Sequence, residues 1–169
     1  AGKSITATIL GGGDVSYTGN VTSDAKTGGD ITAKIDGYGD ISYVGTTSAG
    51  GNIAAEVGGC GSITYTGDTR SGENITAYIT ENGKISYKGA TKAEGSISGV
   101  VAGDGSVEYL GNVQAVRDVT VKTNNGDVLY AGDVRALGNI TGTVNGKGDV
   151  TYVGAVSAGG EVNAATRIS

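Results

Sequence analysis

A repeat of about 22 residues that runs through the whole chain is the feature that most constrains the fold. It is clearest from Asn74 to Gly89, where NITAYITENGKISYKG holds two runs of alternating apolar and polar residues, separated by a glycine turn at Gly83. One tyrosine anchors each unit, and seven tyrosines recur at steps of 26, 22, 22, 22, 21 and 22 residues: Tyr17, Tyr43, Tyr65, Tyr87, Tyr109, Tyr130 and Tyr152.

Within each unit the apolar residues alternate with polar ones, and this period of two predicts strands. A second anchor is the aliphatic residue that opens each unit: Ile5, Ile31, Ile53, Ile75, Ile97, Val119, Ile140 and Val162. Three short strands per unit, separated by glycine corners, describe one coil of a β-solenoid. The sequence therefore predicts an all-β, single-stranded parallel β-solenoid of seven to eight coils, in one domain over residues 1–169. Right-handed coiling is the default for parallel crossovers, and coils ~4.8 Å apart give a rod ~35 Å long.

The composition agrees with a narrow core. Glycine accounts for 33 residues, and Pro, Phe, Trp, Met and His are absent. A wide globular core cannot be filled without large apolar side chains, whereas Ile, Val, Ala and Tyr fill a narrow one. Disorder is the alternative for a glycine-rich chain, but strict alternation of β-branched residues disfavours it.

Two irregularities stand out when both anchors are compared. Four extra residues lie around Asp24 to Gly29, and one residue is missing near Asn124 and Asn125. Both are expected in turns, because loops tolerate changes of length and strand ladders do not.

Equivalent positions of a parallel stack lie above one another, so the seven tyrosines are expected to form one column. Alternation places Tyr87 on the same face as Ile85, and hence inward. We interpret the column as a structural ladder that fixes register, with an exposed sugar-binding stripe as the alternative. The glycine two residues after each tyrosine, such as Gly89, either makes room for the ring or supplies a bend.

Signals for chemistry are weak. The aspartates after the corner glycine, Asp14, Asp40, Asp127 and Asp149, suggest calcium, but Lys84 occupies the same column. The chain offers no histidine and no paired acids within a coil, so we expect no enzyme, no metal and no cofactor. A flat threonine face for ice binding is interrupted by charged residues. Cys60, the single cysteine, is interpreted as a turn residue and less favourably as an intermolecular link.

Partners are constrained by charge and by the ends of the repeat. A net charge of −5 argues against nucleic acid, and no apolar run approaches a membrane span. No capping element is evident before the first opener or after the last, and bare strand edges template association. The residues expected to make an end-to-end contact are Ile5, Ala7, Ile9, Val162, Ala164 and Ile168.

The motif G-x-G-D-[IV]-x-Y-x-G, as in Gly37 to Gly45 and Gly146 to Gly154, resembles the GSGDI repeats of bacterial head-GIN-type adhesin domains. The small-residue repeats are also similar to those of bactofilins, which are polymerising cytoskeletal solenoids. These resemblances imply a right-handed solenoid with a structural or adhesive role.

We therefore expect a structural protein at an extracellular or cell-surface location, assembling head-to-tail with itself into a filament or matrix. The chain begins at Ala1 without a methionine, which favours a removed signal peptide or a fragment of a longer protein. The alternative function is a shaft segment of a surface adhesin that binds a glycan or a host protein.

Overall fold

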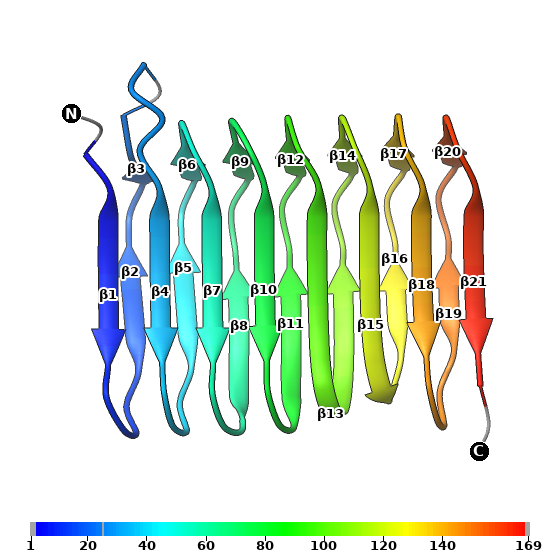
Figure 1. Ribbon diagram of the computed structural model, residues 1–169, viewed down its shortest axis with the longest axis horizontal. Coiled ribbons are helices and arrows are strands. Elements are labelled where there is room, and N and C mark those ends of the chain that lie inside the picture. The colour runs from blue at the N-terminus through cyan, green and yellow to red at the C-terminus, as the bar shows by residue number, and fades with distance from the viewer. Residues whose placement is uncertain (1–2, 25, 168–169) are drawn as a thin grey trace.

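The computed structural model describes residues 3–24 and 26–167. These residues form a β-solenoid of parallel strands, with no helix among them. In Figure 1 the chain descends along the front strands, climbs along the fainter rear strands and advances from left to right, which is a right-handed coil. The expected fold class and the repeat of about 22 residues are thereby confirmed.

The first sheet, called here the long-strand sheet, begins each coil. Its strands present mostly Ile, Val, Ala or Gly inward, whereas Thr, Ser or a charged residue fills most of the outward positions, as the period of two requires. It contains eight strands: β1 (Ile5–Ile9), β4 (Ile31–Ile35), β7 (Ile53–Val57), β10 (Ile75–Ile79), the first part of β13 (Ile97–Tyr109), β15 (Val119–Asn125), β18 (Ile140–Val144) and β21 (Val162–Thr166).

The second sheet, the tyrosine sheet, runs back across the core and carries the anchoring tyrosines. In the fifth coil the corner is extended, so β13 passes from the first sheet into the second without a break. Its seven strands are β2 (Val15–Thr18), β5 (Ile41–Val44), β8 (Gly61–Tyr65), β11 (Gly83–Tyr87), the second part of β13, β16 (Val128–Tyr130) and β19 (Val150–Tyr152).

The third sheet, the short-strand sheet, closes the coil along one narrow side (Figure 1). Its inward residues are Val, Thr, Ala or Ser, which suit the tight corner. Its seven strands are β3 (Val21–Thr22), β6 (Thr47–Ala49), β9 (Thr69–Ser71), β12 (Thr91–Ala93), β14 (Val113–Ala115), β17 (Val134–Ala136) and β20 (Val156–Ala158).

Neighbouring coils pair residue for residue. Ile75, for example, lies opposite Ile53 on one side and Ile97 on the other. The four extra residues lie in the turn between β3 and β4, and the missing residue appears as a register shift between Val101 and Asp104 where β13 meets β15. The insertion thus falls in a turn, as expected. The deletion does not: it lies inside the β13–β15 ladder, because β15 continues through Asn124 and Asn125 and the corner is built there as strand.

The glycine that follows each anchoring tyrosine serves the corner, not the ring. Gly45 has φ +116°, and a Cβ there would lie 2.6 Å from the carbonyl oxygen of Gly19 in the preceding coil. The corner backbones therefore stack too closely for a side chain, and the left-handed φ favours glycine as well. Of the two interpretations, a bend with close backbone approach is the one found.

Candidate interface at the solenoid ends

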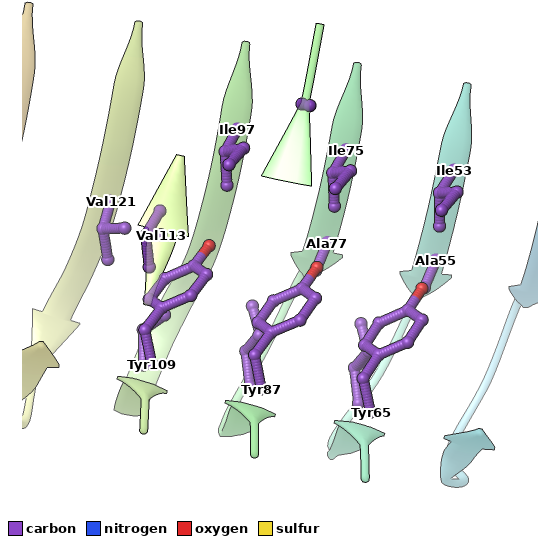
Figure 2. Packing of buried hydrophobic residues seen from close by; sticks show 14 of the residues in the cluster. Ile53, Ala55, Tyr65, Ile75, Ala77, Tyr87, Ile97, Tyr109, Val113 and Val121 are labelled. Atoms are coloured by element: carbon purple, nitrogen blue, oxygen red, sulfur yellow. The ribbon is translucent and has the colours of Figure 1, made fainter. Parts of the chain in front are cut away.

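The seven anchoring tyrosines lie in one column inside the solenoid, and Figure 2 shows three of them with their rings parallel. Adjacent ring centroids are 4.7 to 5.3 Å apart, with interplanar angles of 1 to 12°. The widest spacing, 5.3 Å, separates Tyr109 from Tyr130, where the coil is one residue shorter. The distance between the rings is set by the distance between the strands, and it falls in the favourable range for aromatic pairs. The unbroken stack of rings therefore shows that neighbouring coils keep the same register along the whole rod.

The ring tips are accommodated by a column of small residues on the facing long-strand sheet. In Figure 2 the hydroxyls of Tyr65 and Tyr87 point toward Ala55 and Ala77. At Gly99 a Cβ would lie 3.1 Å from the Tyr109 hydroxyl. The described members of this column are Ala7, Ala33, Ala55, Ala77, Gly99, Val121, Gly142 and Ala164. A large residue facing each tyrosine would overfill so narrow a core.

The tyrosine hydroxyls are buried without hydrogen-bond partners among the described residues. This holds for Tyr43, Tyr65, Tyr87, Tyr109, Tyr130 and Tyr152. Burial, which disfavours the phenolate, raises the pKa of the Tyr65 and Tyr87 hydroxyls well above the ordinary value near 10, and a charge on a neighbouring tyrosine would raise it further. The core therefore keeps these hydroxyls neutral and away from solvent.

Side chains at the three corners cap the backbone of the next coil. The most complete column precedes the long strands, where each side-chain oxygen accepts the backbone N–H of its successor. The Asn74 N–H donates to Asn52 Oδ1 at 3.1 Å, and the Ser96 N–H donates to Asn74 Oδ1 at 2.9 Å. The column is unbroken through Ser4, Asp30, Asn52, Asn74, Ser96, Asp118, Asn139 and Glu161.

These capping bonds all run in one direction, from the N–H of a later coil to the side chain of the earlier one. Asn20, Asp68, Asn112 and Asp133 do the same at the corner after the tyrosine sheet. The rod is therefore polar: its C-terminal end presents side-chain acceptors, and its N-terminal end presents backbone donors.

The aspartates considered for calcium belong to this capping system. Asp14 Oδ1 accepts the N–H of Asp40 at 2.9 Å, and Asp127 Oδ1 accepts the N–H of Asp149 at 3.0 Å. Asp40 Oδ1 likewise accepts the N–H of Ser62 at 2.7 Å, so each of these three carboxylates caps the backbone of the next coil. Within the described residues there is no group of three or more His, Cys, Asp or Glu side chains placed to hold a metal.

The two ends of the described solenoid expose strand edges. β1, β2 and β3 pair on one side only, as do β19, β20 and β21 at the other end. Val162, whose equivalents Ile75 and Ile97 are fully buried, is 51% exposed because none of the described strands of the other two sheets faces β21. Ile5, Ala7 and Ile9 are half-buried and Ala164 is exposed. Ile168, the remaining residue expected at this contact, lies outside the described residues.

The lateral faces carry smaller features. Cys60 lies in the turn before β8 and donates its thiol proton to Glu81 Oε2 at 3.3 Å. Val44, Leu110 and Val153 point outward after their tyrosines and are exposed, with Lys88 in the same row. These scattered apolar groups form a weaker surface feature than the exposed core at the ends.

In comparisons with known proteins, no family model matches the chain, and neither a curated protein nor a solved structure matches it. The described residues include no helix of the length and hydropathy needed to cross a membrane. The fold and the chemistry of the ends are therefore the basis for a function.

Sequence reasoning missed the capping columns, although their signal was present. A residue with a side-chain acceptor precedes each opening aliphatic residue, from Ser4 through Asn74 to Glu161. Asn, Asp and Ser satisfy neighbouring backbone groups readily, so their recurrence at a corner could have been interpreted as capping.

Proposed function

We propose that the protein is a structural subunit that assembles head-to-tail, through the open ends of its solenoid, into an extracellular filament or matrix. The observation that carries the proposal is the state of the terminal coils, in which all three sheets have unpaired edges and inward side chains are exposed. Such edges accept further strands by main-chain hydrogen bonding. A second copy offers the same coil outline, the same register and the complementary end.

The polarity of the capping columns supports head-to-tail over head-to-head contact. Acceptors at the C-terminal end meet N–H donors at the N-terminal end only in the first arrangement. A head-to-tail contact does not close on itself unless the rotation returns to the start, so it extends into a fibre. The tyrosine column, with its unpartnered buried hydroxyls, adds no reactive group and fits a structural role.

The experiment is electron microscopy of the purified chain over a range of concentrations, with Val162→Lys compared against Val153→Lys. Both side chains are exposed in the single subunit, at 51% and 68%, so neither change is expected to unfold it. Val162 becomes buried in an end-to-end junction and a lysine there blocks it, whereas Val153 stays on the side of the rod. We expect filaments from the parent chain and from Val153→Lys only. Particles that remain single at every concentration would refute assembly.

One observation favours the adhesin-shaft alternative. Arg70, Lys92 and Gln114 lie side by side on the outer face of the short-strand sheet and line an open hollow of about 440 Å³, and Arg135 continues the row on the next strand. Such a row of long polar side chains suits an anionic glycan. Arg70 and Lys92 are already paired with Asp68 and Glu94, at 3.4 and 3.2 Å, so this function ranks second. Retention of the chain by immobilised anionic polysaccharide, lost in Arg70→Gln with Arg135→Gln, tests it.

A further inference from the structure

The three sheets of the described solenoid do not contain equal numbers of strands. The long-strand sheet has eight, whereas the tyrosine sheet and the short-strand sheet have seven each. Figure 1 shows the surplus strand β21 at the C-terminal end, equivalent to β1 at the N-terminal end. A second copy therefore cannot continue all three sheets by simple stacking, and head-to-tail assembly must resolve a mismatch of one strand.

Two junctions satisfy the coil geometry. If β21 pairs with β1 of the next copy, the other two sheets are separated by a missing strand, and their apolar inner faces stay uncovered. If β19 and β20 instead pair with β2 and β3 of the next copy, β21 occupies the position of that copy's β1. The first junction continues one sheet, and the second continues all three.

We propose that assembly proceeds by strand exchange, in which β21 of one subunit takes the place of β1 in the next. This inference rests on the proposed head-to-tail function and specifies its junction. β21 then pairs with β18 of its own chain and with β4 of the neighbour. The displaced β1 leaves the stack, and the main-chain bonds that it made to β4 are replaced by those of β21.

The two strands are interchangeable in length and phase. Each has five residues, and each is preceded by a residue of the capping column. The inward positions of β1 are Ile5, Ala7 and Ile9, and those of β21 are Val162, Ala164 and Thr166. Because the small residue stays in the centre, the column that faces the tyrosine rings is preserved through the junction.

Threonine at the last inward position already has a precedent in the rod. Thr123 occupies it in the sixth coil, fully buried, with its hydroxyl donating to the carbonyl of Gly105 at 2.7 Å. Thr166 makes the equivalent bond to the carbonyl of Gly148 at 3.4 Å. The replacement of Ile9 by Thr166 therefore leaves no unpartnered hydroxyl, although it buries less apolar surface.

The exchange also completes interactions that end at the termini of a single rod. Tyr152 of one subunit stacks on Tyr17 of the next, both being only partly buried in the single rod. Asp149 Oδ1 then lies one coil spacing from the N–H of Asp14 in the next subunit. It accepts this N–H as Asp127 Oδ1 accepts the N–H of Asp149 within one chain. Val162 becomes covered by β2 and β3 of the neighbour. In the stacking junction these groups remain a full coil too far apart.

The experiment uses two pairs of engineered cysteines in a Cys60→Ser background. Thr6 and Thr32 lie side by side on the outer face of β1 and β4, and Asn163 is the corresponding residue of β21. In strand exchange Asn163 lies opposite Thr32 of the next copy, and in stacking it lies opposite Thr6. Neighbouring parallel strands place Cα atoms ~4.8 Å apart, within the range that a disulfide spans. Within one chain these residues lie six or seven coils apart, so any disulfide joins two subunits.

We expect oxidised filaments of Thr32→Cys with Asn163→Cys to give a reducible ladder of oligomers on denaturing gels, and Thr6→Cys with Asn163→Cys to give none. The axial advance measured by electron microscopy should be seven coils, ~34 Å, against ~38 Å for stacking. A ladder from the Thr6 pair, an advance of ~38 Å, or filaments in which neither pair cross-links would overturn strand exchange while leaving filament formation intact. Absence of filaments from the parent chain would refute the proposed function itself.

Discussion

Replacing Tyr87 by phenylalanine should stabilise the protein, although it removes a polar group from a well-packed ladder. The ring is 1% exposed and lies between those of Tyr65 and Tyr109, with centroids 4.7 and 4.8 Å away. Its hydroxyl has no hydrogen-bond partner among the described residues. In the unfolded chain the same hydroxyl is hydrated, so folding removes water from it without compensation.

The magnitude follows from two opposing effects. Burying a hydroxyl with no partner costs about 1–3 kcal/mol, and Tyr87→Phe removes this penalty. The space left by one oxygen is on the order of 10 Å³, which costs about 0.2 kcal/mol at the usual cavity coefficient. Stacking on both neighbours is retained because the ring is unchanged. The net expectation is a gain of about 1–3 kcal/mol in the free energy of unfolding.

The assay is urea denaturation followed by circular dichroism, together with hydrogen exchange of the amides of β11. Exchange is included because terminal coils of repeat proteins can unfold separately, and Tyr87 reports on the middle of the rod. Tyr78→Phe is the matched control, since Tyr78 lies on the outer face and should change stability by less than about 0.5 kcal/mol. Tyr87→Ala should lose about 3–5 kcal/mol. A destabilised Tyr87→Phe would show that the hydroxyl is hydrogen-bonded in the core, for example to water, and would refute the reasoning.

Three further predictions concern the rod as a whole. Because burial raises the pKa of the ladder tyrosines, the unfolded chain releases their protons first. Their contribution to stability should therefore be constant below pH ~10 and fall above it by up to ~1.4 kcal/mol per pH unit per buried tyrosine. Alkaline titration followed by circular dichroism measures this fall, and stability that rises above pH ~10 would contradict it. Asn74→Ala leaves the Ser96 N–H without its acceptor and should lower the free energy of unfolding by about 1 kcal/mol in denaturation experiments. Asn74→Asp keeps an oxygen at that place and should lower it less; equal losses from the two variants would show that the amide nitrogen matters instead. Gly89→Ala places a Cβ 2.6 Å from the carbonyl oxygen of Gly67 and should lower the midpoint of thermal unfolding markedly. Lys88→Ala, at the neighbouring exposed residue, is the control and should leave the midpoint unchanged. An unchanged midpoint in Gly89→Ala would mean that the corner opens freely.

The fold was predictable because recurring residues marked the coil length, the start of each coil and the inward face of its strands. The tyrosine anchors gave the coil length, the opening aliphatic residues gave the first strand, and a period of two between them placed Ile75 and Ala77 inward. In a parallel stack the register follows once the coil length is known, because equivalent positions must lie above one another. The extended corner within β13 was not predictable, since Ala102 and Gly103 carry no signal that separates a continuous strand from a turn.

The ends were only partly predictable. Alternation identified Ile5 and Val162 as inward residues of terminal strands. How far their side chains are exposed depends on which strands of the other two sheets face them, and therefore on the arrangement of the strands in each sheet. The direction of the capping bonds could not be obtained either. An asparagine at a corner can accept from the coil on one side or donate to the other, and the backbone geometry at Asn52 and Asn74 decides between these.

The same columns that fix register within the chain would also fix it between chains. A solenoid made of nearly identical coils could accept another coil at several registers, and a slip of one residue would turn every inward side chain outward. At an exchanged junction three separate matches oppose such a slip: Tyr152 on Tyr17, Asp149 with the N–H of Asp14, and Val162 in the place of Ile5. Each repeats a contact that the rod already contains, so a second copy would be recognised by the interactions that hold one copy together. The surplus strand β21 would then add directionality to the proposed assembly, because only an end that can release its first strand would be able to receive β21.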